Sequence, residues 1–337
     1  MQIDREHAEA IATKAFRTKG LQVDDASLVA DVLVTADASG KSSHGLLRLP
    51  RYVRGIEHGN VNPEGAIEIV RESGATATID GGSRPGPVVA ATAMGEAMDR
   101  ADEFGIGAVG VHNSNHLGML GYYTQKARSE GYIGVGMTNT EPAMPPYGGA
   151  EPVLGTNPIA IGLPTEPPFN LDMSTSAIAR GTVLKEKEAD GAIPDDVALD
   201  ADGEPTTDPE AALDGTILPF GGPKGSGLAI AVEVLAGGLV GAAMGRDVTG
   251  TYHTEDPCTK GDLFLAIDPT AFAGDGFVEQ ASSFLSNLKD EPTAAGVDSI
   301  RLPGEAALER ERDATTVSVG DDLWETVRSI ADGETDE

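Results

Sequence analysis

Two types of side chain suited to catalysis lie close together in the segment SSHGLLRLPRY, residues 42–52. His44 precedes Arg48 by four residues, so a helix would place both on one face. Histidine moves protons near neutral pH, and arginine clamps a carboxylate through two parallel hydrogen bonds. The segment predicts an acid–base group beside a carboxylate clamp. The alternative, a solvated helix face capped by Ser42 or Ser43, is favoured by spacing alone.

A second histidine, His116, lies in NSNHLGMLGYY, residues 113–123. The segment follows a predicted buried strand and precedes a predicted helix. Loops at strand ends of α/β proteins bind ligands, and the N-terminus of a helix can hold a phosphate. His116 is therefore a candidate for proton exchange. A histidine that only caps the helix fits the pattern equally well.

A long segment with few charges, residues 139–158, offers the neutral hydrogen-bonding side chains of Thr140, Thr156 and Asn157. A site lined in this way suits a small polar substrate.

Three consecutive hydroxyls, Ser174, Thr175 and Ser176, could line a phosphate or a ribose, or simply form an edge strand or turn. Lys224 stands between glycines in GGPKGSG, where a ligand can approach the backbone closely. We interpret it as a candidate charge partner for phosphate.

Two glycine-rich segments do not match known nucleotide-binding motifs in context. GIGAVG, residues 105–110, follows a predicted helix and enters a strand, the reverse of the order that a dinucleotide-binding motif requires. We interpret it as a helix cap followed by a strand, and expect the cofactor elsewhere. GGPKGSG does not have the residue order of a P-loop. No metal is expected, since only His112 and His116 are close and a strand end separates them.

Hydrophobic periodicity indicates the elements that must hold these residues. Helices are expected at residues 24–37 and 44–56, and strand spacing covers the segment from Ile67 to Asp80. The further expected elements are helices at 87–104, 120–130, 226–244, 276–289, 304–312 and 320–331 and strands at 108–112, 133–138 and 263–267. The acidic, turn-rich segment 186–215 is expected to be an exposed excursion.

The charge of the chain excludes several classes of partner. The formal net charge is −30, from 54 acidic and 24 basic residues. Nucleic acid and anionic membrane surfaces need clustered lysine and arginine, so neither is an expected partner. Dispersed acidic residues with few lysines are typical of a protein adapted to high salt, where screening removes the self-repulsion.

Other features point to the cytoplasm. The single cysteine, Cys258, allows no internal disulfide. The first sixteen residues lack the apolar region of a signal peptide, and no stretch reaches about 18 uninterrupted apolar residues.

Taken together, the segments resemble the malate/L-lactate dehydrogenase family of the second type. The resemblance is carried by DASGKSSHGLLRLPRY, NSNHLGMLGYY, PPYGGAEPVLGTNPIAIGLPT, LDMSTSAIARG, LPFGGPKGSGLAIAVEVLAGGL and RLPGEAALERER, in family order from residue 37 to residue 312. It implies an α/β fold in a homodimer, with a non-Rossmann NAD(P)-binding lobe, residues 71–275, built on a mixed sheet. Both chain ends, residues 1–70 and about 276–337, would form a helical lobe.

The resemblance also implies roles for individual residues. Ser43 and His44 would be the relay and the proton donor, Arg48 the substrate-carboxylate ligand, and Thr156 a substrate contact. His116 matches a histidine treated as the proton acceptor in some members. The segments matched to cofactor contacts contain Leu120, Thr140, Ser174, Thr175, Ser176, Lys224, Gly225, Gly304 and Glu305.

The expected function is the NAD(P)-dependent interconversion of a small 2-hydroxy acid, malate- or lactate-like, and its 2-oxo acid. The alternative is reduction of a cyclic imine, or a substrate of the sulfolactate, ureidoglycolate or diketogulonate type. Two departures from the family, Thr182 after ARG and the segment IPDDVALD where relatives carry a Trp, bear on the cofactor's 2′ end and on the substrate relay. A third hypothesis, a non-enzymatic acidic binding protein, ranks last because both histidines and Arg48 are present.

Overall fold

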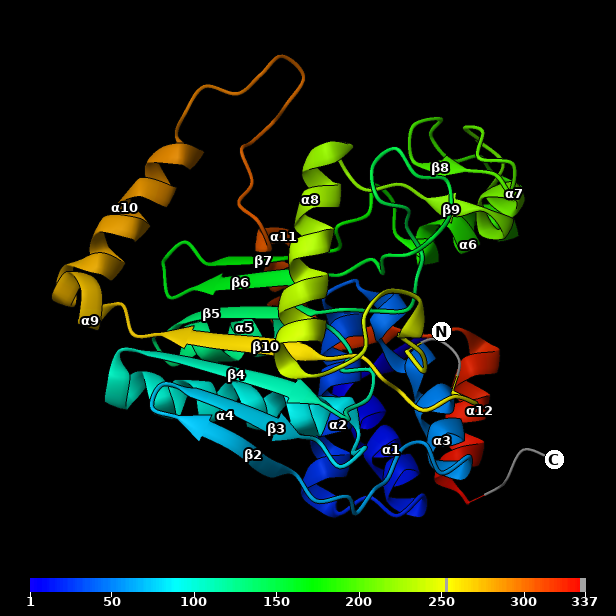
Figure 1. The fold of residues 1–337 in the computed structure, drawn as a ribbon, viewed down its shortest axis with the longest axis horizontal. Coiled ribbons are helices and arrows are strands. Elements are labelled where there is room, and N and C mark those ends of the chain that lie inside the picture. Colours follow the sequence, from blue (N-terminus) through cyan, green and yellow to red (C-terminus); the bar gives the residue numbers. More distant parts are fainter. Residues whose placement is uncertain (252–253, 334–337) are drawn as a thin grey trace.

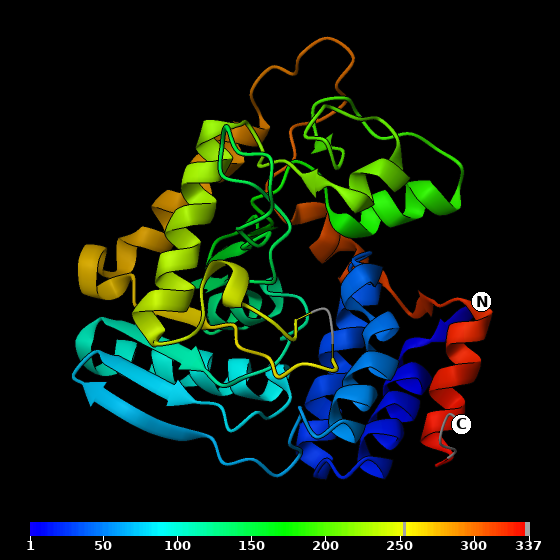
Figure 2. The same ribbon diagram turned by 45° about the vertical axis from the view of Figure 1, so that its right-hand side comes forward.

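The two chain ends meet in one helical layer of the computed structural model, which describes residues 1–251 and 254–333. Helix α1 packs against α2 and α12, and strand β1 pairs antiparallel with β11. Figures 1 and 2 show these N-terminal and C-terminal elements side by side at one end of the molecule. Their shared core includes Phe16, Leu33, Leu49 and Trp324, all buried.

The helices are α1 Arg5–Thr18, α2 Val23–Ala38, α3 Leu49–Glu57, α4 Gly86–Phe104, α5 Gly121–Ser129, α6 Arg180–Glu188, α7 Pro209–Asp214, α8 Pro223–Val232, α9 Thr270–Ala273, α10 Phe277–Lys289, α11 Glu305–Asp313 and α12 Asp321–Ala331. The strands are β1 Gln2–Asp4, β2 Glu68–Ser73, β3 Thr76–Asp80, β4 Ile106–His112, β5 Ile133–Thr138, β6 Ile159–Leu163, β7 Phe169–Met173, β8 Ala198–Leu199, β9 Thr216–Ile217, β10 Asp262–Ile267 and β11 Thr316–Ser318.

A mixed sheet forms the centre of the second layer. Among the described residues it has seven strands in the order β2-β3-β4-β10-β5-β6-β7. Strand β10 runs antiparallel to both β4 and β5, so these two strands run in the same direction. Asp262, at the start of β10, pairs with Val111 on one side and Thr138 on the other. The loops that follow β4 and β5, which carry His116 and Thr140, therefore leave the same edge of the sheet.

Helices cover both faces of the sheet (Figure 1). Helices α4 and α5 pack on one face, where Met94, Tyr123 and Phe264 are fully buried. Helix α8 crosses the other face, and its Val232 packs with Leu263. This arrangement confirms the expected mixed α/β fold.

Most expected elements are present, with boundaries that agree or shift by at most three residues. The helix expected at 44–56 is wrong at its start: residues 42–44 and 46–48 form 3-10 turns, and α3 begins only at Leu49. The segment from Ile67 to Asp80 is a hairpin rather than one strand, because Gly74 takes a left-handed turn conformation with φ +54°. The helix expected at 226–244 begins at Pro223 and changes to a π-helical turn at Glu233–Gly237.

The GIGAVG segment confirms the expected order of elements. Gly105 ends α4 in the left-handed conformation, φ +79°, and β4 begins at the next residue. A Cβ atom on Gly107 would lie 2.0 Å from the carbonyl oxygen of Ala97. This glycine therefore serves the close packing of α4 on β4.

Segment 186–215 is more than a loop. Its acidic side chains face solvent for the most part, but Ile193, Val197 and Ala212 are buried in a small core with Val183 of α6. The division of the chain into two lobes at the expected boundaries stays a prediction. Helix α10 lies at the far side of the sheet from α1 (Figure 1).

One stretch, Pro223–Val240, is long and apolar enough to cross a membrane by length and composition, with a mean hydropathy of 1.2. It contains Lys224 and Glu233, so it does not contradict the expectation that no stretch reaches about 18 uninterrupted apolar residues. The stretch is 44% buried, and core helices of soluble proteins meet the same criterion. It packs on the sheet through Val232 and Ala236.

Candidate active site

The loop between α2 and α3 carries His44 and is held by a half-buried carboxylate. Asp37, in the last turn of α2, accepts a hydrogen bond from the backbone N–H of Leu46 at 2.8 Å. A Cβ atom on Gly45 would lie 2.1 Å from Asp37 Oδ1, so only glycine leaves room for this contact. Burial raises the pKa of the Asp37 carboxyl to about 7. The turn at Gly45 also explains why the expected helix does not start at His44.

His44 and Arg48 are brought together by this loop rather than by a helix face. The Oγ of Ser43 lies 3.0 Å from Nδ1 of His44, and Nε of Arg48 donates to the carbonyl of Ser43 at 2.7 Å. These contacts orient both the imidazole and the guanidinium from one residue. Ser43 therefore lies where a relay residue is expected.

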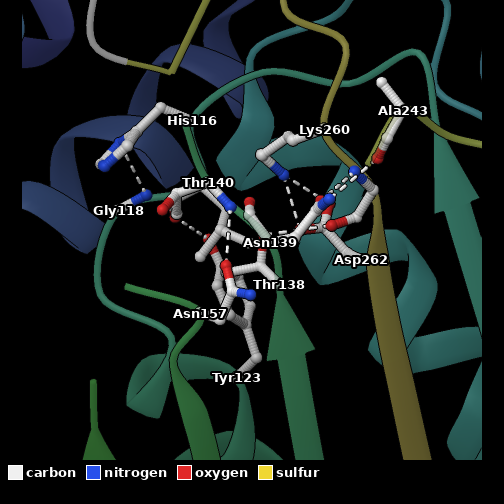
Figure 3. Close-up of polar contacts among 12 residues, drawn as sticks. His116, Gly118, Tyr123, Thr138, Asn139, Thr140, Asn157, Ala243, Lys260 and Asp262 are labelled. Carbon is white, nitrogen blue, oxygen red and sulfur yellow. Dashed lines mark hydrogen bonds and ion pairs between the residues drawn. The ribbon is translucent and has the colours of Figure 1, made fainter. Parts of the chain in front are cut away.

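His116 stacks beside His44, with ring centroids 5.8 Å apart and an interplanar angle of 25°. Its Nδ1 accepts a hydrogen bond from the backbone N–H of Gly118 at 3.2 Å (Figure 3). Tyr52 Oη lies 2.7 Å from the same nitrogen. Because a backbone N–H can only donate, Nδ1 carries no proton. The neutral ring then holds its proton on Nε2, so His116 presents an N–H donor.

Both histidines are neutral at pH 7 in the free protein. Burial, followed by the positive charge of Arg48, lowers the pKa of His44 to about 4. Burial, followed by Arg48 and His44, lowers the pKa of His116 well below its usual value. An unperturbed histidine in the unfolded chain has a pKa of about 6.5, so below this pH the unfolded chain binds more protons than the folded one. The free energy of unfolding should therefore fall as the pH drops from about 6.5 to about 4, the pKa of His44 in the fold.

A second group of expected residues forms a hydrogen-bonded wall around Thr156. The backbone N–H of Thr156 donates to Oγ1 of Thr140 at 3.0 Å, and Thr175 donates to the carbonyl of Thr156 through both its N–H, at 2.8 Å, and its Oγ1, at 2.9 Å. Ser174 and Ser176 lie beside Thr175, with their hydroxyl oxygens 2.8 Å apart. The structure thus brings together the threonines and the row of hydroxyls that the sequence places apart.

Lys224 lies near this wall, at the exposed start of α8. The backbone N–H of Phe220 donates to the carbonyl of Thr175 at 3.0 Å, which sets the turn before Lys224 beside the row of hydroxyls. A Cβ atom on Gly225 would lie 2.1 Å from the carbonyl oxygen of Phe220. Gly225 therefore closes the turn and is itself buried.

A cavity of about 320 Å³ opens where the helical layer meets the sheet. The residues that line it include Lys41, Asp172, Arg301, Gly304 and Arg310. Lys41 forms an ion pair with Asp172 across it. Since Lys41 precedes His44 by three residues and Asp172 precedes Ser174 by two, this pair links the histidine loop to the row of hydroxyls.

Two of the residues expected to contact the cofactor have side chains that contact the protein itself. Leu120 is buried in the core beneath α5, so its side chain does not face the cavity. Glu305 forms an ion pair with Lys289 and accepts the backbone N–H of Leu302 at 2.9 Å. It therefore shapes the turn that carries Gly304.

Three neighbours of the histidines are absent from the sequence-based set. Tyr52 contacts His116 from α3, and Lys260 forms a buried ion pair with Asp262 at 2.6 Å (Figure 3). Tyr52 lies in the segment 42–52 and could have been found from its helical position. No sequence pattern points to the Lys260–Asp262 pair.

Among the described residues, no group of three or more His, Cys, Asp or Glu could hold a metal ion.

Comparison with known proteins places the whole chain among dehydrogenases. A family model described as malate/L-lactate dehydrogenase matches residues 3–328. The chain is 44% identical to the L-sulfolactate dehydrogenase of Methanothermobacter thermautotrophicus, over 98% of this chain and 96% of that protein. It is 42% identical to the malate/(S)-sulfolactate dehydrogenase of Methanothermus fervidus, over 98% of both chains. The solved structure of the sulfolactate dehydrogenase from Methanocaldococcus jannaschii matches with a TM-score of 0.94 and 42% identity, over 99% of this chain and 97% of that one.

Proposed function

The chain belongs to the malate/L-lactate dehydrogenase family, and we propose that it interconverts a small 2-hydroxy acid and its 2-oxo acid with NAD or NADP as hydride carrier. The observation that carries this proposal is the grouping of His44, His116 and Arg48 at one edge of the sheet. Hydride transfer needs a group that moves the hydroxyl proton and a cation that binds the carboxylate.

The proposed roles follow from the geometry. Arg48 binds the substrate carboxylate. His44, neutral and oriented by Ser43, takes the hydroxyl proton during oxidation and returns it during reduction. His116 donates a hydrogen bond from Nε2 to the substrate oxygen, because its Nδ1 is occupied by the Gly118 N–H. Thr156 contacts the substrate from the wall that it forms with Thr140 and Thr175.

The residues around the cavity fit the phosphate-bearing part of a dinucleotide. The cavity volume lies at the lower end of the usual range of ligand pockets, and Arg301 and Arg310 supply positive charge for phosphates. A Cβ atom on Gly304 would lie 2.2 Å from the carbonyl oxygen of Asn170, so this turn requires glycine. Backbone atoms rather than a side chain therefore form the cavity wall at this position. We propose that the cofactor is held by Gly304, Thr140, the hydroxyls of Ser174, Thr175 and Ser176, and Lys224. When bound, its nicotinamide supplies or accepts the hydride.

We propose a substrate with two anionic groups. Arg48, Arg51 and Lys260 all lie close enough to His116 to lower its pKa, although the chain carries a net charge of −30. Lys260 is paired with Asp262, so the two arginines beside this half-buried imidazole are the cations that favour a dianion over a neutral or singly charged molecule. The two relatives named above act on malate or sulfolactate, which agrees with this choice.

A substrate screen tests the proposed function. Purified protein should oxidise NADH or NADPH with a dianionic 2-oxo acid, such as oxaloacetate or sulfopyruvate, at least tenfold faster than with pyruvate. Faster reduction of a cyclic imine would favour the alternative function. No turnover with any member of the panel would reject both.

We propose a cytoplasmic homodimer whose subunits meet at the α8 face, defined here as Ile230, Val234, Leu235 and Leu239. These side chains are 36–64% exposed on a stretch that carries two charged residues in eighteen. A contiguous exposed apolar patch marks an interaction site. A second copy is the occupant that the family resemblance favours.

The α8 face predicts the effect of Val234→Asp. Burying an unpaired carboxylate between subunits is costly, so light scattering should give the mass of one chain, 34.7 kDa, for the variant and twice that mass for the wild type. Phe104→Asp, which changes an exposed apolar residue outside the face, should leave the mass unaltered. A dimeric Val234→Asp variant would reject this surface, and recovery of the wild type with membranes would point to a lipid partner instead.

We also propose that the fold is adapted to high salt. Unscreened repulsion among 54 acidic residues, opposed by only 24 basic ones, destabilises the compact state at low ionic strength. The melting temperature should therefore rise steadily as KCl increases from 0.1 to about 2 M, because the Debye length falls from about 10 Å to below 3 Å. Sodium sulfate at matched ionic strength separates screening from other salt effects. A melting temperature that stays constant or falls in KCl would contradict the proposal.

A further inference from the structure

A buried carboxylate lies behind the Thr140–Thr156 wall. Glu233 is 5% exposed. Its Oε1 accepts hydrogen bonds from Nδ2 of Asn139 and the backbone N–H of Gly245, both at 2.9 Å, and its Oε2 accepts from Nδ2 of Asn157 at 2.6 Å. Within residues 1–251 and 254–333, no cation lies within ion-pair distance of it. The charge is thus stabilised by N–H donors alone, an arrangement that is costly unless every donor is in place.

A local distortion of the helix accompanies this carboxylate. Glu233 is the first residue of the π-helical turn Glu233–Gly237, which interrupts the run of α8. Val234 and Leu235, which follow it, are exposed, whereas Glu233 is buried against Asn139 and Asn157. Single π-turns of this kind occur frequently at functional sites.

The hydrogen bonds of Glu233 continue to the wall of the site. Asn157, which takes a left-handed backbone conformation with φ +33°, accepts the backbone N–H of Thr140 on its Oδ1 at 3.2 Å. Thr140 in turn accepts the N–H of Thr156 at 3.0 Å. Figure 3 shows the contact between Thr140 and Asn157 beyond the end of β5. An unbroken chain of contacts therefore runs from Glu233 through Asn157 and Thr140 to Thr156.

We propose that Glu233 is a positioning residue that fixes Thr140 and Thr156 for cofactor and substrate binding. This inference rests on the proposed function, which assigns the cofactor to Thr140 and the substrate to Thr156. The carboxylate sets the orientation of the Asn157 amide together with the carbonyl of Ala229, which accepts from the same Nδ2 at 3.0 Å. Because Nδ2 faces these two acceptors, Oδ1 faces the Thr140 N–H.

The donor and acceptor pattern makes Glu233→Gln an informative change. The glutamine has almost the same shape but carries one NH₂ group. Its oxygen can satisfy the two donors at the Oε1 position, and its NH₂ then meets Nδ2 of Asn157. If Asn157 flips its amide to accept that NH₂, it turns Nδ2 toward the Thr140 N–H. Either arrangement leaves two donors facing each other. The second arrangement, with the flipped Asn157 amide, displaces Thr140.

The experiment measures cofactor binding and kinetics for Glu233→Gln, Thr140→Ala and the double variant. We expect Glu233→Gln to melt cooperatively, but to raise the Kd for NADH or NADPH and the KM for the oxo acid by about tenfold. The double variant should bind within about twofold of Thr140→Ala alone, because both changes act through the same wall. Thr165→Val, which removes a buried hydroxyl that donates to the carbonyl of Pro167 at 3.1 Å, should keep wild-type Kd and KM.

The outcomes separate this inference from the proposed function. Wild-type Kd and KM in Glu233→Gln, wild-type binding in Thr140→Ala, or losses that multiply in the double variant would each overturn the inference. If Glu233→Gln does not fold, Asn157→Gly tests the same chain of contacts. Glycine tolerates the left-handed backbone, so this variant should fold and show the tenfold losses, and wild-type binding would again overturn the inference. A wild-type protein that binds neither cofactor would instead reject the proposed function.

Discussion

Replacing His44 by alanine should lower kcat by about 10²–10⁴-fold and remove one limb of the pH profile. His44 is the candidate base because burial and Arg48 keep it neutral, with a pKa of about 4, while Ser43 orients its ring. As the pH rises through 4, the ring loses its proton. In the wild type, kcat/KM for oxidation should therefore rise to a plateau above this pH, while kcat/KM for reduction should fall.

His116→Ala provides the critical comparison. It should lower kcat by removing the Nε2 donor, but should keep the limb that belongs to His44. His112→Ala is the control, because His112 lies outside the His44–His116 pair and its Nδ1 is 4.0 Å from Oδ2 of Asp80. This variant should retain wild-type kinetics. A normal pH profile in His44→Ala together with a lost limb in His116→Ala would reverse the two assignments.

Arg48→Lys should raise the substrate KM by about 10- to 150-fold and change the Kd of the cofactor little. The loss corresponds to roughly 1.5–3 kcal/mol for one charge-assisted hydrogen-bonded pair. Lysine keeps the positive charge but loses the planar guanidinium, whose Nε is fixed by the Ser43 carbonyl at 2.7 Å. The steady-state KM of the oxo acid and the Kd of NADH or NADPH together measure the two effects.

Arg54→Lys is the matched control for this prediction, since Arg54 lies exposed on α3, the helix that begins directly after Arg48. It should leave both constants at their wild-type values. A wild-type substrate KM in Arg48→Lys would show that the carboxylate binds elsewhere. A Kd for the cofactor that rises as much as the KM would place Arg48 on the cofactor instead.

The sequence predicted those residues of the site that can be identified from residue type and local spacing. His44, Arg48 and His116 lie in short segments whose chemistry is readable, and the structure brings them together through β4 and the loop after α2. The order of helix and strand around GIGAVG also correctly excluded a Rossmann arrangement. Local periodicity found most helices and strands for the same reason.

Contacts between distant segments could not be predicted from the sequence. Tyr52 and His116 are 64 residues apart, and Lys41 and Asp172 are 131 apart, so no spacing rule joins them. The start of α3 was misplaced because a tertiary contact, Asp37 with the N–H of Leu46, replaces helical hydrogen bonds at Gly45. Leu120 was matched by family position alone, and its side chain lies in the core.

The central claim is that this protein transfers a hydride between the nicotinamide and C2 of a 2-oxo acid. It is tested most directly with cofactor that carries two deuterium atoms at the nicotinamide C4, followed by mass spectrometry of the product. The account predicts a 2-hydroxy acid with one deuterium at C2, and an unlabelled C2 when ordinary cofactor is used in D₂O. A product whose C2 hydrogen comes from solvent, or no reduced product from any 2-oxo acid, would contradict it.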